Sequence, residues 1–534
     1  MNRVVISAKR SLPPLPPMNQ APAPQPQSSA MKPSVQAALR PLLTGAWLVA
    51  ALAASAADQP QLGEHFTRNQ VSSETKLPDQ VDAATGQGIK WTAKLGSSSY
   101  STAVVAQGRV FIGTNNDAPR DSRHQGDRGV LNCLEESTGK FLWHLIVPKI
   151  GGDQYLDWPK VGLASPATVE GDRVYLLTNR AEVVCLDVRG MANGNDGPFV
   201  DEAQHQTPAG KDLIPVGPND ADILWVTDLR MVADIWPHDT AYGNPLLHGD
   251  YIYINSNNGV DNTHRVIRKP DAPSLVVLDK KTGRLVAKDN EHIGPRIFHQ
   301  TYSSPALGTV KGRTLVCFGG GDGVLYAFDA LTEMPPAGTV VNLKRAWKFD
   351  PDPGAPKADV HQFTGNRKVS PSNIMTPPVF VGDRIYLTGG GDLWWGKNEA
   401  WLTCLSADQP GDTTATAALW SYPLKQTCST PAVAGPLTFT ADTAEKTINC
   451  VETTTGKELW QHPVGGEVWS SPLVADGKVY LGTRRGKLFI FAASREKKLL
   501  CETTLDASIS AAPSAANGVV YITTDETLYA LARP

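Results

Sequence analysis

The chain has 534 residues, with 50 Lys and Arg against 53 Asp and Glu and a formal net charge of −3. This balance provides no basic surface that could follow a phosphate backbone, so we expect no nucleic-acid partner. The 47 glycines and 41 prolines indicate a chain rich in turns, and a hydrophobic content of 41% is enough for a large core, which argues against disorder.

Residues 1–57 have the composition of a leader. After a proline-rich start, basic residues follow Met31, an apolar run spans 42–54, and small residues precede Asp58. This layout predicts a signal peptide that begins at Met31 and is removed before Asp58, followed by a linker over 58–80. We therefore expect a periplasmic or secreted protein with no transmembrane segment after cleavage. The apolar run is short for a membrane span, which makes a membrane anchor the weaker alternative.

A repeated unit fills residues 81–534. In its fullest form, a Ser-Pro or Thr-Pro pair precedes a short apolar run, a Gly-containing turn, a second run, another Gly-containing turn, and a third run that leads to Thr-Gly-Lys and Trp. A repeat of about 40 residues with four short strands is typical of a β-propeller. Eight units are marked in chain order by Ala103, Pro166, Pro245, Pro305, Pro377, Pro431, Pro472 and Pro513.

The last unit contains only three strands before the chain ends, and an unpaired strand pattern, 89–95, precedes the first unit. Pairing the two ends would complete the eighth blade and remove two open sheet edges. The sequence thus predicts an all-β, eight-bladed propeller of four-stranded antiparallel blades, the last closed by the N-terminal strand. A kelch or WD40 ring is the competing interpretation, but the signature of neither is present.

The segments CLEESTGKFLW (133–143) and CVETTTGKELW (450–460) resemble the tryptophan-docking motif of the PQQ-like (quinoprotein-type, BamB-like) β-propeller family. A third copy, which begins at Val277, ends in Ala287 where Trp is expected. In this motif a Trp of one blade packs over the Thr-Gly corner of the next, where glycine leaves room for the ring. The resemblance, which extends over 81–534, assigns structural docking roles to Trp91, Gly139, Trp143, Trp225, Gly283, Trp347, Trp420, Gly456 and Trp460.

The same resemblance implies two classes of function. One comprises PQQ- and Ca²⁺-dependent dehydrogenases, which usually clamp PQQ between a Trp and two adjacent disulfide-bonded cysteines, with Glu, Asn and Asp near the Ca²⁺. The other comprises non-catalytic scaffolds similar to the BamB subunit of the outer-membrane assembly machine. This sequence has no Cys-Cys pair and no matching Glu/Asn/Asp set. We therefore predict a binding scaffold without assigned catalytic residues. A PQQ/Ca²⁺-dependent alcohol or sugar dehydrogenase is the alternative, and a hydrolase or lyase is a third class without a recognisable nucleophile.

The seven cysteines do not suggest a disulfide framework. Four occupy equivalent positions in four separate units, where they are expected to be small buried residues: Cys133, Cys185, Cys404 and Cys450. A disulfide among Cys317, Cys428 and Cys501 stays open. The absence of Cys-x-x-Cys-His excludes an attached c-type haem.

Long connections are predicted to share one face of the ring. In a four-stranded antiparallel blade, the loops between the second and third strands leave on the same side as the connections between blades. Two further insertions, 188–222 and 330–345, belong to the opposite side. We expect a protein or cell-envelope ligand to bind a monomer on the long-loop face. Its six long loops are 115–129, 148–162, 230–243, 257–273, 350–373 and 389–400.

Polar and aromatic residues in and beside these loops form the candidate binding site. His238 and His299 enter the inner strands of adjacent blades, and the Trp394–Trp395 pair suggests contact with a sugar, a peptide or a protein. Hydrogen bonds that fix the loops, or a simple turn role for Asp322, are the structural alternatives. No local ligand spacing predicts a metal site. The candidates are Trp236, His238, Asp239, Asp261, His264, His299, Asp322, Asp392, Trp394, Trp395 and Lys397.

Overall fold

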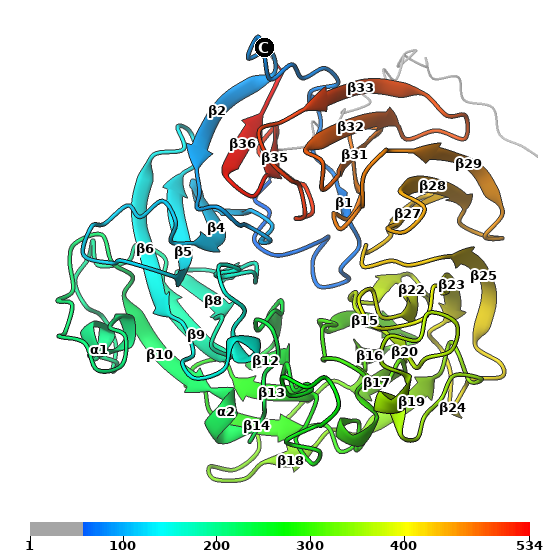
Figure 1. Cartoon of the computed structure of the whole chain (residues 1–534), viewed down its shortest axis with the longest axis horizontal. Helices are drawn as coiled ribbons and strands as arrows, with labels where there is room; N and C mark the ends of the chain where they lie inside the picture. The colour runs from blue at the N-terminus through cyan, green and yellow to red at the C-terminus, as the bar shows by residue number, and fades with distance from the viewer. Residues whose placement is uncertain (1–56, 534) are drawn as a thin grey trace, which may run out of the picture. The chain divides into compact units, whose positions relative to one another are not determined.

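The computed structural model describes residues 57–533, so the predicted leader lies outside the described residues apart from Ala57. Eight sheets follow one another around a ring, each with its edge toward the centre of the ring (Figure 1). The prediction of an eight-bladed propeller of four-stranded antiparallel blades is confirmed. Within residues 57–533, no helix is long and apolar enough to cross a bilayer.

The strands of each blade follow one another from the centre of the ring outward. Blade 1 comprises β3 (Val104–Ala106), β4 (Arg109–Asn115), β5 (Arg128–Glu135) and β6 (Phe141–Pro148), and blade 2 comprises β7 (Thr168–Glu170), β8 (Arg173–Leu177), β9 (Glu182–Asp187) and β10 (Ile223–Asp228). Blade 3 comprises β11 (Leu246–His248), β12 (Tyr251–Asn255), β13 (Leu275–Asp279) and β14 (Leu285–Lys288). Blade 4 comprises β15 (Ala306–Val310), β16 (Arg313–Gly319), β17 (Leu325–Asp329) and β19 (Arg345–Phe349).

Blades 5 to 8 repeat this arrangement. Blade 5 comprises β21 (Val379–Val381), β22 (Arg384–Gly391), β23 (Ala400–Ser406) and β25 (Ala418–Leu424), with β20 (Ser372–Asn373) also paired to β22. Blade 6 comprises β26 (Ala432–Ala434), β27 (Leu437–Asp442), β28 (Thr447–Glu452) and β29 (Glu458–Pro463), and blade 7 comprises β30 (Leu473–Ala475), β31 (Lys478–Gly482), β32 (Lys487–Ala492) and β33 (Leu499–Thr504). Blade 8 comprises β34 (Ser514–Ala516), β35 (Val519–Thr523), β36 (Thr527–Leu531) and β2 (Ile89–Lys94).

The hydrophobic core lies between blades. The central strands are buried on both faces, as in β9, whereas in the outer strand β2 buried and exposed residues alternate from Trp91 to Lys94. One cluster joins Phe111 and Leu131 of blade 1 to Leu176 and Val184 of blade 2, and similar clusters follow around the ring. Each blade therefore stabilises its neighbours by burying apolar surface that it cannot bury alone.

The two ends of the propeller meet in blade 8. Strand β2 pairs antiparallel with β36, which places Trp91 opposite Ala530 and Thr92 opposite Tyr529. Figure 1 shows this junction where the blue N-terminal strand lies beside the red C-terminal one. The predicted closure is confirmed, and it leaves blade 8 with the four strands of the other blades.

Insertions between third and fourth strands pair with the outer edge of the preceding blade. The parallel strands β18 (Val341–Asn342) and β24 (Gly411–Asp412) extend blades 3 and 4 beyond β14 and β19. Insertion 188–222, which contains α1 (Glu202–Gln206), pairs at Asp220 with His144 in β6. The insertions expected on the face opposite the long loops thus lie along the rim of the ring, because the outer strands offer unpaired backbone groups there.

The tryptophans assigned to docking pack between blades. A methyl group added at Gly139 would lie 2.6 Å from Cε3 of Trp91, and Trp91 Nε1 donates to the carbonyl of Glu136 at 2.9 Å. Methyl groups added at Gly283 and Gly456 would lie equally close to the rings of Trp225 and Trp420, and Trp143 packs over Gly190. The indole N–H groups of Trp143, Trp347, Trp420 and Trp460 donate to carbonyls of the following blade.

Residues 57–77, the first part of the predicted linker, run around the inside of the ring, and we call them the inner belt. Its strand β1 (Val71–Ser72) pairs in parallel with β30 and lies near the centre of Figure 1. The belt forms hydrogen bonds with the innermost strands, next to the turns that lead to the second strand of each blade. It therefore lies at the end of the channel away from the long loops. Its backbone or side chains hydrogen-bond to Val105, Val169, Asn244, Leu307, Phe380, Val433, Val474 and Gly518, so it contacts all eight blades.

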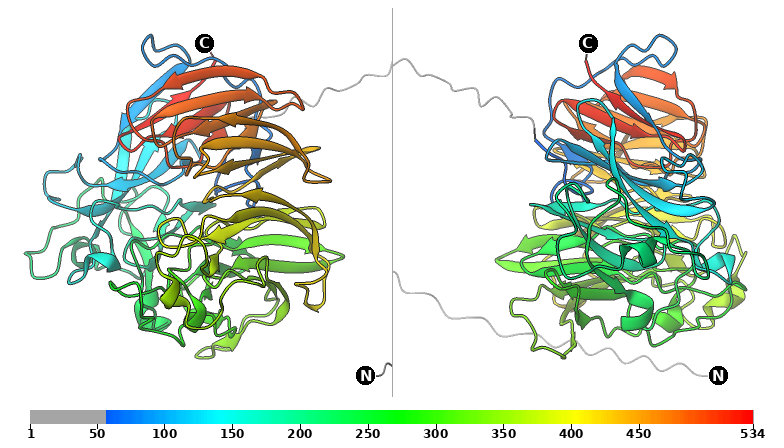
Figure 2. Two further views of the ribbon diagram at one scale, coloured as in Figure 1. Left: turned by 45° about the vertical axis from the view of Figure 1, so that its right-hand side comes forward. Right: turned by 90° about the vertical axis from the view of Figure 1, so that its left-hand side faces the viewer.

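The remaining elements are short. Figure 2 shows the ring obliquely in its left-hand view and from the side in its right-hand view, with irregular connections around the blades. These connections contain helix α2 (Leu229–Val232) and the single-turn helices η1 (Gln154–Leu156), η2 (Gly294–Arg296) and η3 (Val360–Phe363).

Candidate functional site

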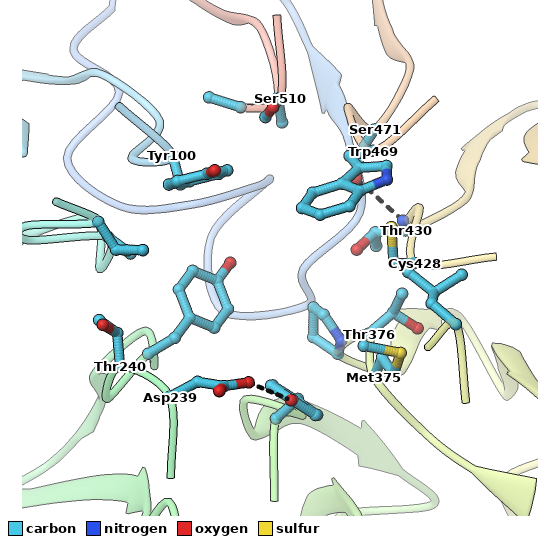
Figure 3. Close-up of a pocket in the computed structure, with 18 of the residues that line it drawn as sticks. Tyr100, Asp239, Thr240, Met375, Thr376, Cys428, Thr430, Trp469, Ser471 and Ser510 are labelled. Atoms are coloured by element: carbon cyan, nitrogen blue, oxygen red, sulfur yellow. Dashed lines mark hydrogen bonds between the residues drawn. The ribbon is translucent and has the colours of Figure 1, made fainter. Parts of the chain in front are cut away.

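A cavity of about 510 Å³ occupies the channel of the propeller, and we call it the axial cavity. The inner belt contributes Leu62 and Gln70, and the connections between blades contribute most of the remaining wall. Figure 3 shows Tyr100 and Trp469 side by side at the open centre, where their ring centroids lie 6.3 Å apart. The aromatic lining of the axial cavity consists of Tyr100, Tyr155, Trp158, Tyr242, Tyr302, Trp394, Trp395 and Trp469.

Asp239 brings a carboxylate to this aromatic wall. Its Oδ2 accepts a hydrogen bond from the Tyr302 hydroxyl at 3.4 Å, drawn as a dashed line in Figure 3. Burial raises the pKa of Asp239, while His299 opposes that shift. The backbone of Asp239 has a φ of 55°, the left-handed region that non-glycine residues rarely adopt. Such local strain is common where a loop holds a side chain in a functional position.

Three histidines meet beside Asp239, and we call them the histidine cluster: His238, His264 and His299. The Nε2 atoms of His238 and His264 lie 3.2 Å apart, and one nitrogen from each of the three rings falls within 4.8 Å of the others. His264 and His299 line the axial cavity. Burial lowers the pKa of His238 to about 2, with the other two histidines adding to the effect, so this ring is neutral.

Asp392 organises the loop that carries the tryptophan pair. One oxygen, Oδ1, accepts hydrogen bonds from the backbone N–H groups of Trp394 and Trp395 at 3.0 and 2.9 Å. The other, Oδ2, accepts from Nδ1 of His299 at 3.0 Å. Asp392 is fully buried, and its charge raises the pKa of His299 against the effect of burial. One carboxylate therefore fixes both the aromatic loop and the orientation of a histidine.

The structure brings seven of the eleven sequence candidates together and separates the other four. Asp322 forms an ion pair with Arg296 at 2.7 Å, and Asp261 binds Thr263 and Arg268 within its own loop. The other four candidates are Trp236, Asp261, Asp322 and Lys397, and none of them is part of the wall of the axial cavity.

Trp236 and Lys397 have their own surroundings. Arg268 lies over the ring of Trp236, 5.8 Å from its centroid. Lys397 pairs with Asp352 at 2.7 Å and lines a separate polar cavity that also contains Trp401. These contacts explain both side chains without a ligand.

The sequence interpretation missed most of the cavity wall, although a signal for it existed. Six lining residues occupy the position three residues before the marker of their unit. That position lies just before the innermost strand, so its side chain enters the channel in unit after unit. The six are Tyr100, Tyr242, Tyr302, Cys428, Trp469 and Ser510.

Comparison with known proteins finds a family model that matches part of the repeated region. Residues 399–495 match the model of a family described as "Outer membrane protein assembly factor BamB". The matched segment runs from β23 to β32 and contains the docking residues Trp420, Gly456 and Trp460. The resemblance of the sequence to PQQ-like β-propellers is thereby confirmed. None of the curated protein sequences matches the chain.

Solved structures with a similar fold include BamB from Moraxella catarrhalis, at 12% identity and a TM-score of 0.49, over 82% of this chain and 97% of that one. Quinohemoprotein alcohol dehydrogenase from Comamonas testosteroni is 14% identical, with a TM-score of 0.45, over 90% and 81% of the two chains. A europium-containing methanol dehydrogenase is 12% identical, with a TM-score of 0.42, over 89% and 98%. Identities this low say nothing about a shared ligand.

Proposed function

We propose that this chain is an exported, periplasmic PQQ-like β-propeller that binds a small, uncharged, ring-shaped ligand, such as a mono- or disaccharide, in its axial cavity. The observation that carries the proposal is the aromatic wall of that cavity, bounded by the inner belt at one end and reached from the long-loop face at the other. Export rests on the predicted signal peptide.

The size and chemistry of the cavity support a small ligand. A volume of about 510 Å³ lies within the usual range for small-molecule sites, which combine apolar and aromatic walls with a few polar groups. Hydroxyl groups suited to hydrogen-bonding a polyol are spaced around the wall between the aromatic rings. They belong to Thr102, Thr240, Thr376, Thr430, Ser471 and Ser510, several of which are labelled in Figure 3.

The tryptophan pair favours a ligand inside the channel over a protein on the rim. Trp394 packs against Trp469, with ring centroids 5.8 Å apart, and Trp395 packs against His264 at 4.7 Å. Both rings line the cavity, and Trp395 is half-buried. A protein-docking pair would present its faces outward instead.

The dehydrogenase alternative is supported less well, because the residues present do not fit PQQ. PQQ is a tricarboxylic acid, and none of the described residues lining the axial cavity is Lys or Arg. Arg484 lies behind the wall, where it covers the ring of Trp469 at 4.0 Å. The carboxylate that does face the cavity, Asp239, would repel the cofactor, and Cys428 is the single cysteine there.

Binding is tested by titrating the purified chain with a panel of neutral mono- and disaccharides while following tryptophan fluorescence and thermal unfolding. Trp469→Ala should weaken binding at least about 10-fold, whereas Trp236→Ala, which removes a tryptophan outside the cavity, should leave it unchanged. Saturable binding of PQQ with Ca²⁺, accompanied by dye-linked alcohol oxidation and no binding of neutral sugars, would overturn the proposal. Cell fractionation tests the periplasmic location separately.

A further inference from the structure

The histidine cluster has the geometry of a metal site. His238 and His299 come from the connections that precede blades 3 and 4, and His264 from a loop within blade 3. Their three rings are at least nine-tenths buried, and their nitrogens lie within 4.8 Å of one another. Four-coordinate zinc with Zn–N bonds of about 2.0–2.1 Å requires nitrogen separations of about 3.3 Å. The 3.2 Å between the Nε2 atoms of His238 and His264 meets this requirement.

The rings of the histidine cluster also have partners outside it. Nδ1 of His299 donates to the buried carboxylate of Asp392 at 3.0 Å. The rings of His238 and His264 hydrogen-bond to the backbone of Val260 and Asn262. Metal-binding histidines are normally fixed in this way, with one nitrogen anchored to a carboxylate or a carbonyl and the other left for the metal.

The inward nitrogen of His299 has no hydrogen-bond partner in the described structure. Its Nε2 is fully buried, and the nearest carboxylate oxygen of Asp239 is 3.6 Å away. A buried polar atom without a partner destabilises the folded state, so it calls for an explanation such as an ion. Asp239 also lies 3.5 Å from Nε2 of His238, so it could complete the coordination or hold a metal-bound water.

From these contacts we propose that His238, His264 and His299 bind one divalent transition-metal ion, of the zinc class, in the wall of the axial cavity, with Asp239 beside the fourth position. Imidazole nitrogens favour zinc, copper, nickel and iron over calcium and magnesium. Because His264 and His299 line the cavity, the fourth position faces the channel. The site does not depend on a saccharide binding there.

A second histidine-containing cluster provides the control. His124 and His144 lie with Asp121 and Asp220 at the outer edge of blade 1. Both carboxylates already contact Arg123, so their charge is compensated. Both ring nitrogens of His124 also lack a hydrogen-bond partner in the described structure, so this cluster is the competing place for an ion. His124→Gln therefore removes a buried histidine of the same kind without touching the channel.

The test uses the full mature chain without a histidine tag, stripped with a chelator and dialysed against Zn²⁺. We expect one Zn²⁺ per chain by elemental analysis, and Co²⁺ should give the visible absorption of four-coordinate cobalt with nitrogen ligands. His299→Gln should weaken Zn²⁺ binding at least about 100-fold, and Asp392→Asn about 10-fold. His124→Gln should bind as the original chain does.

Circular dichroism and thermal unfolding in chelator establish that the variants are folded. The proposal is overturned if the stripped chain takes up no Zn²⁺ at micromolar concentration, if a folded His299→Gln variant keeps its affinity, or if His124→Gln loses the ion instead. A sugar-binding result of either kind leaves these readouts unchanged, so failure of one proposal is distinguishable from failure of the other.

Discussion

Arg68 in the inner belt donates a hydrogen bond from Nε to the carbonyl oxygen of Pro305, 237 residues away, at 2.9 Å. Its other nitrogens donate to the carbonyls of Leu62 and Asn244. The guanidinium is completely buried, which lowers its pKa to about 9. A single side chain thus joins the belt to blades 3 and 4, entirely through backbone carbonyls that would otherwise be unpaired.

Replacing this guanidinium should destabilise the propeller. Arg68→Ala leaves several buried carbonyls without donors, and we expect the free energy of unfolding to fall by about 2–4 kcal/mol. Denaturant unfolding followed by tryptophan fluorescence measures the loss. Arg495→Ala, at an exposed ion pair with Glu452, should cost less than about 1 kcal/mol. Equal effects of the two substitutions would show that the belt contributes little.

The parts of the fold that could be predicted are those that leave a repeated or unpaired pattern in the sequence. Blade number and closure could be predicted because the prolines and the Thr-Gly-Lys corners recur with a period, and because 89–95 was an obvious unpaired strand. The belt could not, because its contacts are mainly backbone hydrogen bonds, which leave no hydrophobic period.

The site was predictable only in part for a similar reason. The loops do carry residues that line the axial cavity. The ring nitrogens of His238, His264 and His299, however, converge from three separate connections. No local spacing reveals such a cluster. Asp322 and Lys397 had suggestive sequence surroundings, yet nearby ion pairs with Arg296 and Asp352 account for them.

Docking of Trp91 on blade 1 can be measured with a matched pair of glycines. Gly139 and Gly108 have nearly the same φ, 72° and 71°, so alanine costs about 1 kcal/mol of backbone strain at either position. An added methyl meets the Trp91 ring at Gly139 and nothing within 4 Å at Gly108. Gly139→Ala should therefore be less stable than Gly108→Ala by about a further 1–3 kcal/mol.

The origin of that further loss is tested in a Trp91→Ala background. Without the indole ring, Gly139→Ala and Gly108→Ala should have the same effect on the free energy of unfolding. If the two substitutions still differed in their effect on the free energy of unfolding without the ring, the Thr-Gly corner would stabilise the protein by a contact other than the one with Trp91.

The cysteines should be reduced and unreactive in the folded protein. All seven are free in the structure, so the disulfide left open among Cys317, Cys428 and Cys501 does not form there. Burial raises the pKa of Cys428 in the cavity wall to about 12, which leaves about one thiol in 10⁴ ionised at pH 8. Mass spectrometry should find no rapid alkylation by iodoacetamide under native conditions and seven alkylated cysteines in guanidinium without reductant. Fewer than seven would indicate a disulfide.

The buried carboxyl of Asp222 should make stability fall as the pH rises. One of its oxygens, Oδ1, has no hydrogen-bond partner in the described structure. Burial raises the pKa of Asp222 to about 6, and the charges of Asp187 and Glu202 add to the shift, while a hydrogen bond from the backbone of Asp196 opposes it. Between an unfolded pKa of about 4 and a folded pKa of about 6, the folded state holds the proton more tightly, so the stabilisation present below pH 4 is lost by about pH 6.

Asp222→Asn should remove this dependence. At pH 7.5 the variant should be more stable than the original chain by about 1–2 kcal/mol, and the difference should vanish near pH 4, as measured by urea unfolding across that range. Asp212→Asn, which makes the same change in net charge at an exposed position, should follow the original chain at every pH. If Asp222→Asn instead lowered stability at pH 7.5, the carboxylate would have to be stabilised by more than the hydrogen bond from the backbone of Asp196.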